Sequence, residues 1–113
     1  MKILYAEDSG ELQTLITEFL EISVPGIKIT KARDGKEALE KYSPDFDLVL
    51  TDYQMPHHSG EFLAKALRAL NYTKPIILFT GSSNLVEDIS LFDCILEKSA
   101  PHALIDEIRQ RAI

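Results

Sequence analysis

The chain has 113 residues, of which 45% are hydrophobic and 27% charged, and its formal net charge is −6 at pH 7. This length suits one domain with a core of its own, and the acidic balance argues against direct binding to nucleic acid. No apolar run approaches the roughly 20 residues of a membrane span, and the single cysteine, Cys94, excludes an internal disulfide. We therefore expect a cytoplasmic protein without a membrane partner, in which Cys94 is a buried, inert thiol.

The first part of the chain alternates two predicted strands with two predicted helices. The apolar run at residues 2–6 predicts a buried strand, and the alternation at residues 27–32 predicts a second one. Helices are expected at residues 11–22, with Ser9 as the N-cap, and at residues 34–42. The core face of the first helix should be formed by apolar residues at helical spacing: Leu12, Leu15, Ile16, Phe19 and Leu20.

The rest of the chain continues the same alternation. Three more strands are expected, at residues 47–52, 74–81 and 91–98. A helix at residues 61–70 should bury one side, consisting of Phe62, Leu63, Ala66 and Leu70. Residues 82–90 are only weakly helical, so the fourth helix should be a turn or so, or irregular. The last helix is expected at residues 100–113, with Pro101 in its first turn.

Alternating strands and helices predict a single α/β domain over residues 1–113. Its parallel five-stranded sheet should have the order 2-1-3-4-5, with helices on both faces, a doubly wound three-layer sandwich. Right-handed crossovers then place a switch point between neighbouring strands, and ligands bind there, outside the carboxyl ends of the strands.

Polar residues follow four of the predicted strands at their carboxyl ends: Glu7 and Asp8, then Asp52, Thr80 and Lys98. Three carboxylates on one rim repel one another unless cations offset their charge. Mg²⁺ prefers such oxygen ligands, Lys98 supplies a fixed charge, and Thr80 offers a hydroxyl donor to a phosphoryl oxygen. Because an aspartate can attack phosphorus, these residues predict metal-assisted phosphoryl transfer onto Asp52.

Five stretches of the sequence resemble the receiver domain of two-component response regulators, and together they cover nearly the whole chain: "ILYAEDS", "DGKEALEKY", "DLVLTDYQMPHHSGEF", "PIILFTG" and "ILEKSAP". The resemblance implies a flavodoxin-like (βα)5 fold, similar to chemotaxis regulators. It also implies phosphorylation of Asp52 by a phosphohistidine on a sensor histidine kinase or a phosphotransfer protein, or by a small acyl phosphate.

The resemblance implies a role for each residue of the rim. Mg²⁺ would be held by Glu7, Asp8, Asp52 and the backbone carbonyl of Gln54. The phosphoryl group would be bound by Thr80 and Lys98. The side chains of Gln54 and Ser82 would tune how long the acyl phosphate survives.

The chain departs from the family pattern in several places. Ile95 stands where Tyr or Phe usually couples to Thr80 as a switch, so the readout of phosphorylation should be altered, and the short fourth helix should change how a partner is engaged. The peptide bond between Lys98 and Ser99 is expected to be trans, since a cis bond costs about 2.5–4 kcal/mol. His57 and His58 are interpreted as exposed loop residues, with a partner contact as the next possibility.

The favoured hypothesis is a single-domain response regulator that signals through phosphorylation-dependent contacts with a downstream protein, or passes phosphate along a relay. It would catalyse only its own phosphorylation and dephosphorylation. The alternative is a pseudo-receiver that acts as a constitutive interaction module, which Ile95 and the short fourth helix favour. The acids of "AEDSGEL" disfavour an FMN protein, and Gln54 disfavours an aspartate-based phosphatase of the haloacid dehalogenase type.

Overall fold

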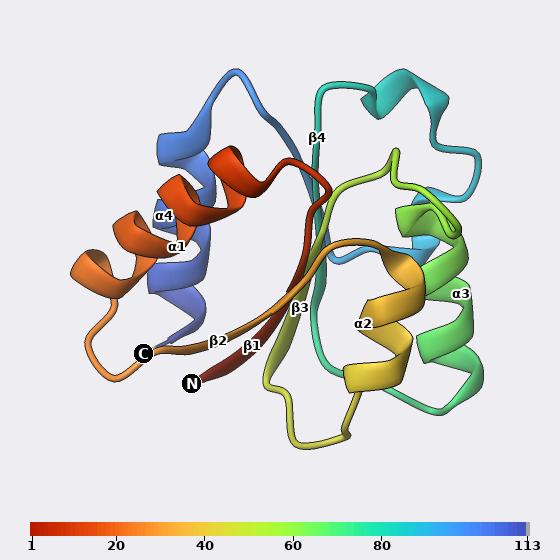
Figure 1. Cartoon of the computed structure of the whole chain (residues 1–113), viewed down its shortest axis with the longest axis horizontal. Coiled ribbons are helices and arrows are strands. Elements are labelled where there is room, and N and C mark those ends of the chain that lie inside the picture. Colours follow the sequence, from red (N-terminus) through yellow and green to blue (C-terminus); the bar gives the residue numbers. More distant parts are fainter. Residues whose placement is uncertain (113) are drawn as a thin grey trace.

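A computed structural model describes residues 1–112 of the chain (Figure 1). Within these residues one parallel sheet contains five strands, in the order β2-β1-β3-β4-β5. The strands are β1 (Lys2–Ala6), β2 (Lys28–Ala32), β3 (Leu48–Thr51), β4 (Ile76–Thr80) and β5 (Cys94–Glu97). The predicted fold class and strand order are therefore confirmed.

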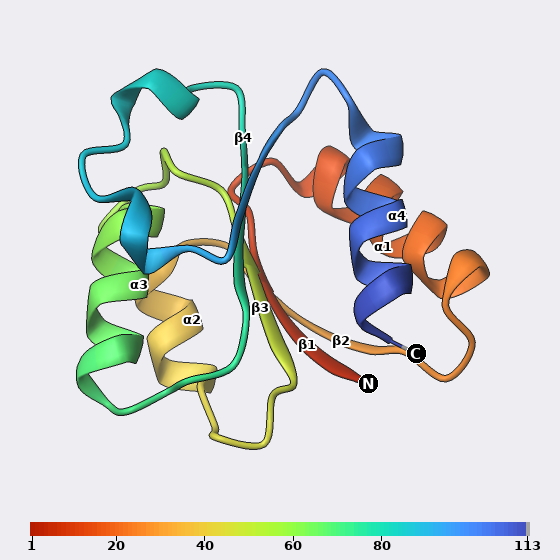
Figure 2. The same ribbon diagram turned by 180° about the vertical axis from the view of Figure 1, so that it is seen from behind.

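Four α-helices in the described part of the chain cover the two faces of the sheet. Helices α1 (Gly10–Ser23) and α4 (Pro101–Arg111) lie on one face, and α2 (Gly35–Lys41) and α3 (Gly60–Ala69) lie on the other (Figures 1 and 2). The predicted last helix ran to Ile113, which lies outside the described residues. None of the helices described is both long and apolar enough to cross a membrane.

The sheet separates two apolar clusters because its strands alternate their side chains between the faces. Along β1, Leu4 and Ala6 belong to the cluster with the buried residues of α2 and α3, while Ile3 and Tyr5 belong to the cluster with those of α1 and α4. Every residue of β3 and β4 is buried. These strands are therefore the rigid centre from which the following residues project.

Side-chain caps define where three helices begin. The Ser9 hydroxyl accepts from the backbone N–H of Leu12, which confirms the predicted N-cap of α1. The Asp34 carboxylate and the Ser59 hydroxyl make the same contact at the starts of α2 and α3. Each cap satisfies a backbone donor that the helix leaves free at its first turn.

The predicted core face of α1 was partly wrong. Leu15 and Phe19 are 48% and 47% exposed, whereas Gln13 and Thr17 are buried beside Ile16 and Leu20. The Gln13 amide nitrogen donates to the carbonyls of Tyr5 and Ala32, each at 2.9 Å. A polar side chain can thus occupy the core face because it bonds to backbone groups of β1 and β2.

The predicted core face of α3 was also partly wrong. Phe62 and Leu70 are 48% and 58% exposed, and Ala66 is half-buried. Leu63 is buried as expected, and the rest of the buried face consists of Gly60, Glu61, Ala64 and Leu67. The helix is therefore rotated about its axis relative to the prediction, which places the Glu61 carboxylate inside.

The connection between β4 and β5 contains two short 3₁₀ turns, Ser83–Leu85 and Ile89–Leu91, in place of a fourth α-helix. This confirms the expectation of a short or irregular element. The fifth strand begins at Cys94 rather than at Leu91, because Leu91 still belongs to the second turn. No cis peptide bond occurs in the described residues, so the bond between Lys98 and Ser99 is trans as expected.

Arg68 joins the end of α3 to the sheet and to the β4–β5 connection. Its guanidinium donates to four oxygen atoms at 2.8–3.2 Å, which belong to the carbonyls of Tyr72, Lys74 and Leu91 and the carboxylate of Asp93. The same Asp93 oxygen accepts from the N–H of Ile76 at 2.8 Å. Arg68 thus fixes the entries to both β4 and β5.

Replacing Arg68 by lysine is expected to lower the free energy of unfolding by about 2 kcal/mol, because an ammonium keeps the charge but cannot reach all four acceptors. Urea denaturation measures the change. Arg109→Lys is the matched control, since Arg109 is exposed and its ion-pair contact with Asp106 is long, at 3.9 Å. Equal stabilities of the two variants would contradict the role assigned to Arg68.

Candidate functional site

The candidate site lies at the carboxyl ends of the strands, where the backbone ladder continues one residue past β1 and β3. In the sheet Ala6 lies opposite Thr51. The N–H of Asp52 donates to the carbonyl of Ala6, and the N–H of Glu7 donates to that of Ala32, each at 3.0 Å. The ladder therefore holds the backbones of Glu7 and Asp52 as neighbours on the rim.

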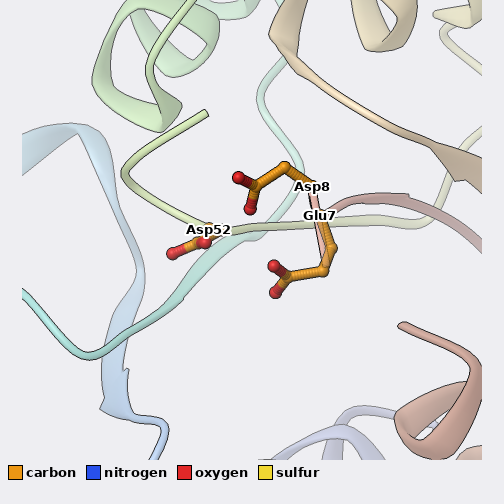
Figure 3. A group of neighbouring side chains, drawn as sticks. All are labelled: Glu7, Asp8 and Asp52. Atoms are coloured by element: carbon orange, nitrogen blue, oxygen red, sulfur yellow. The ribbon is translucent and has the colours of Figure 1, made fainter. Parts of the chain in front are cut away.

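Three carboxylates meet at this rim (Figure 3). Oxygen atoms of Glu7, Asp8 and Asp52 lie within 4.8 Å of one another. Glu7 is 1% exposed and Asp52 is 5% exposed, whereas Asp8 is exposed. The donor set fits Mg²⁺, which binds carboxylate oxygens. Glu7 Oε1 is buried and accepts no hydrogen bond, although the Lys98 ammonium lies beside it.

Lys98 reaches the carboxylates from the end of β5. Its Nζ lies 2.8 Å from Asp52 Oδ2 and 3.1 Å from Glu7 Oε1. The backbone N–H of Lys98 donates to the carbonyl of Thr80 at 3.0 Å, which continues the β4–β5 ladder past Glu97. The structure thus brings Lys98 onto two of the three carboxylates and places buried Thr80 on the neighbouring strand.

Burial and charge set the protonation of this cluster. Burial, and next the Asp52 charge, raise the pKa of Glu7 from 4.5 to about 7, although the N–H of Ser9 and the Lys98 ammonium act in the opposite direction. Burial alone lowers the pKa of Lys98, but its hydrogen bond to Asp52 and the charges of both carboxylates raise it overall. Lys98 therefore stays an ammonium while Glu7 titrates near neutral pH.

This shift predicts a pH-dependent stability in metal-free solution. Folded protein holds the Glu7 proton up to about pH 7, whereas the unfolded chain releases it near 4.5. The Glu7 contribution to the free energy of unfolding therefore falls as pH rises from about 4.5 to about 7. The unsubstituted protein should lose about 2–3 kcal/mol of its free energy of unfolding between about pH 5 and pH 8 through this titration. Glu7→Gln removes the titration, so the difference in free energy between variant and unsubstituted protein should shift by that amount in favour of the variant.

Urea denaturation across that pH range, in a buffer with a chelator, measures the change. Glu18→Gln is the matched control because Glu18 is exposed on α1. Parallel pH profiles for Glu7→Gln and the unsubstituted protein would refute the assignment.

Asp52 is held from two sides and is followed by a tightly folded loop. Its Oδ1 accepts from the N–H of Tyr53 at 2.7 Å, and its Oδ2 accepts from Lys98. A Cβ atom at Gly60 would lie 2.1 Å from the Asp52 carbonyl oxygen, so only glycine allows the chain to return this closely. The loop therefore fixes the Asp52 backbone as well as its side chain.

The two predicted tuning residues lie on separate segments around the rim. Gln54 is exposed and lines a shallow hollow of about 390 Å³, together with Asp8, Tyr53, Met55, Pro56 and Ser59. Ser82 is half-buried, and its N–H donates to the Thr80 hydroxyl oxygen at 3.0 Å. Their effect on the lifetime of an acyl phosphate stays a prediction.

The predicted switch position is occupied by a half-buried aliphatic residue. Ile95 lies opposite Leu78 in the β4–β5 ladder and packs against the apolar cluster that includes Leu78. Because side chains alternate along β4, Thr80 lies on the same face of the sheet as Leu78. Ile95 thus provides an aliphatic contact, in place of an aromatic one, on the face of the sheet that carries Thr80.

The two loop histidines differ in their surroundings. His57 is exposed, as expected, with its Nε2 3.9 Å from an Asp34 oxygen, and it has a positive φ of 71°. His58 is half-buried rather than exposed, because its ring stacks on Phe62 with centroids 4.1 Å apart. Cys94 is likewise half-buried rather than buried, and burial raises the pKa of its thiol, which favours the unreactive form.

A sequence profile of the response regulator receiver domain matches residues 3–109. The chain belongs to this family. The transcriptional regulatory protein CpxR of Escherichia coli K12 is 38% identical over 84 residues, which make up 74% of this chain and 35% of CpxR. The chain thus spans about a third of the length of CpxR.

Solved receiver structures superimpose over nearly the full chain. Response regulator TrrA of Thermotoga maritima, in complex with Mg²⁺ and BeF, is 31% identical with a TM-score of 0.85 and covers 99% of this chain and 98% of its own. TrrA in complex with the histidine kinase ThkA has a TM-score of 0.82 at 31% identity, with 99% and 97% coverage. The chemotaxis regulator CheY4 of Vibrio cholerae has a TM-score of 0.83 at 26% identity, with 99% and 98% coverage.

Two residues that the sequence did not single out contact the β4–β5 connection, and one of them, Tyr53, also contacts Asp52. The Tyr53 hydroxyl donates to the carbonyl of Leu85 at 3.2 Å. The buried Glu61 carboxylate accepts from the backbone N–H groups of Glu87 and Asp88. A glutamate in the first turn of an amphipathic helix ordinarily faces solvent, so its sequence context carried no signal of this contact.

Proposed function

We propose that the chain is a phosphoacceptor receiver in which Asp52 accepts a phosphoryl group from a phosphohistidine. The observation that carries this proposal is the bond between the Lys98 ammonium and Asp52, in a rim that also holds the Glu7 and Asp8 carboxylates. A buried aspartate with one oxygen on a fixed cation is presented as a nucleophile at the open end of the sheet.

In the proposed reaction an Asp52 oxygen attacks phosphorus, so that a P–O bond forms while the P–N bond to the histidine breaks. The departing imidazole nitrogen retains the electron pair of that bond. Lys98 and the Thr80 hydroxyl then contact the oxygens of the transferred group, which offsets its charge. Hydrolysis of the acyl phosphate by water returns Asp52 and releases inorganic phosphate, so the chain acts only on its own phosphorylation.

The residues that would hold Mg²⁺ are Glu7, Asp8, Asp52 and the backbone carbonyl of Gln54. When bound, the ion supplies positive charge that offsets the phosphoryl oxygens and the carboxylates. The exposed Asp8 carboxylate leaves oxygen atoms for this purpose, and Glu7 Oε1 accepts no hydrogen bond although Lys98 Nζ lies 3.1 Å away. The Mg²⁺-BeF complex of TrrA supports the same assignment.

The proposed phosphoryl donor is a sensor histidine kinase or a phosphotransfer protein, which the kinase complex of TrrA supports. The proposed output is a contact with a downstream protein that depends on phosphorylation, without direct binding to nucleic acid or membrane. A cytoplasmic location and signalling as a single domain stay predictions of the sequence. The intact set of rim residues favours this function over a constitutive pseudo-receiver.

Transfer of labelled phosphate tests the proposal. The protein is incubated with Mg²⁺ and labelled acetyl phosphate, and the label should enter the unsubstituted chain as an acyl phosphate that hydroxylamine removes. Asp52→Asn should take up no label, while Asp45→Asn, at an exposed position before β3, should match the unsubstituted chain. Equal labelling of Asp52→Asn, or no labelling of the unsubstituted chain, would overturn the proposal.

A further inference from the structure

The β4–β5 connection is held mainly by polar contacts. None of residues 81–91 is buried, although Val86 and Leu91 are half-buried against the apolar cluster on that face. Figures 1 and 2 show the connection passing beside the loop that follows β3 and the start of α3. Segments with little buried apolar surface open at low free energy, so their polar anchors decide how firmly they are held.

The Glu61 carboxylate is the strongest of these anchors. Its Oε1 accepts from the N–H of Glu87 at 3.0 Å, and its Oε2 accepts from the N–H of Asp88 at 3.2 Å. Glu61 is 6% exposed, so these charge-assisted bonds are shielded from water. Glu61 directly follows Gly60, whose backbone packs on the Asp52 carbonyl.

Tyr53 is a second anchor, and it contacts the acceptor aspartate directly. Its hydroxyl donates to the Leu85 carbonyl at 3.2 Å, while its backbone N–H donates to Asp52 Oδ1 at 2.7 Å. Tyr53 therefore contacts both the Asp52 carboxylate and the β4–β5 connection. Any change in the charge or position of Oδ1 acts on the backbone that carries the Tyr53 ring.

The start of the connection is also tied to the site. The N–H of Ser82 donates to the Thr80 hydroxyl oxygen at 3.0 Å. A Thr80 hydroxyl that turned toward a phosphoryl group on Asp52 would remove this acceptor from the N–H of Ser82. By contrast, the Ser83 hydroxyl donates to the Glu97 carboxylate on β5, which is independent of Asp52.

We propose that Tyr53 and Glu61 form a clasp that holds residues 85–88 while Asp52 is unmodified and releases them when Asp52 is phosphorylated. This inference rests on the phosphoacceptor function proposed above, and release of residues 85–88 would be the structural change that follows phosphorylation. Phosphorylation converts the Asp52 carboxylate into an acyl phosphate, so the backbone N–H of Tyr53 loses an ionised acceptor. The N–H of Ser82 loses the Thr80 oxygen when that hydroxyl turns to the phosphoryl group, which loosens the start of the connection. The clasp performs the coupling that an aromatic residue at position 95 does not provide here.

Amide hydrogen exchange at Glu87 and Asp88 reads the clasp directly, because these N–H groups are the ones that Glu61 binds. Exchange is followed by NMR, with and without Mg²⁺ and beryllofluoride, a stable mimic of the phosphoryl group. Beryllofluoride should accelerate exchange at both amides about tenfold, as expected when a hydrogen bond of this kind is lost. The amide signals of Thr80 and Lys98 report occupation of the pocket in the same samples.

Tyr53→Phe removes the hydroxyl and keeps the ring. In this variant the Glu87 and Asp88 amides should exchange faster than in the unsubstituted protein before beryllofluoride is added. Adding beryllofluoride should then change their exchange rates by less than about twofold. Tyr42→Phe is the matched control, since Tyr42 is a half-buried tyrosine that contacts Tyr72 edge to face. Glu61→Gln is a second variant, which retains one acceptor oxygen and should free one of the two amides.

The outcomes separate this proposal from the function on which it rests. If beryllofluoride shifts the amide signals of Thr80 and Lys98 but leaves hydrogen exchange at Glu87 and Asp88 unchanged, the clasp alone would be overturned. The same would follow if Tyr53→Phe and Glu61→Gln responded to beryllofluoride as the unsubstituted protein does. If the Thr80 and Lys98 signals of the unsubstituted protein do not change on addition of beryllofluoride, the phosphoacceptor function is overturned, and the clasp with it.

Discussion

Lys98→Met is expected to slow phosphorylation of Asp52 by about a hundredfold, because it removes a fixed charge that contacts the reacting group. Methionine is unbranched, as lysine is, so the change removes the ammonium while keeping an apolar stem of similar shape. In the structure this ammonium lies 2.8 Å from Asp52 and 3.1 Å from Glu7. The rate of labelling by acetyl phosphate measures the effect.

The same variant is expected to be less stable in metal-free solution. Without Lys98 the Glu7 and Asp52 carboxylates face each other with no fixed cation, which should lower the free energy of unfolding by about 2 kcal/mol near pH 8. The Lys98 side chain is 25% exposed, so this figure is below that of a fully buried pair. The loss should shrink toward about pH 5, because a carboxyl whose pKa is raised takes up a proton there.

Lys36→Met, at an exposed position on α2, is the matched control and should leave both the rate and the stability unchanged. Normal labelling of Lys98→Met would remove Lys98 from the proposed reaction. A stability loss that is the same at pH 5 and pH 8 would show that the residue acts through packing rather than through charge.

Gly60→Ala is expected to lower the free energy of unfolding by about 3 kcal/mol, the upper part of the range for overpacking a dense site. The added Cβ would lie 2.1 Å from the Asp52 carbonyl oxygen and 3.2 Å from a Leu78 methyl group. Backbone has to move to relieve the first contact, so Asp52 itself should be displaced. Phosphorylation of Asp52 should therefore slow as well.

Gly10→Ala is the matched control because a Cβ there would meet nothing within 4 Å. Alanine is the better helix former, so this variant should be at least as stable as the unsubstituted protein. Urea denaturation compares the two. A Gly60→Ala protein that is as stable as Gly10→Ala would show that the loop can relax without strain.

The strands were predictable because each is a short apolar run bounded by turn residues, as in β1 and β4. Both acidic residues after β1, and Asp52 after β3, could be placed on one rim from this alternation alone. The predicted faces of α1 and α3 failed at Phe19, Phe62 and Leu70, since apolar residues stand on more than one side of these helices. The spacing of apolar residues predicts that a helix forms, but which of its sides is buried depends on how the helix packs on the sheet.

Polar contacts over long sequence separations were beyond prediction. Gln13 is buried because it bonds to two strand carbonyls, and Glu61 is buried because it binds two amides of a later segment. Arg68 likewise reaches carbonyls on both sides of β4. Such contacts depend on the three-dimensional arrangement of the elements, which a local pattern does not contain.

The absence of buried residues between Gly81 and Leu91 has a consequence for how this protein can change. Substitutions there leave the two apolar clusters almost untouched, so the connection can diverge in sequence at little cost in stability. Recognition of a new partner could therefore arise in this segment while the rim and the sheet stay as they are.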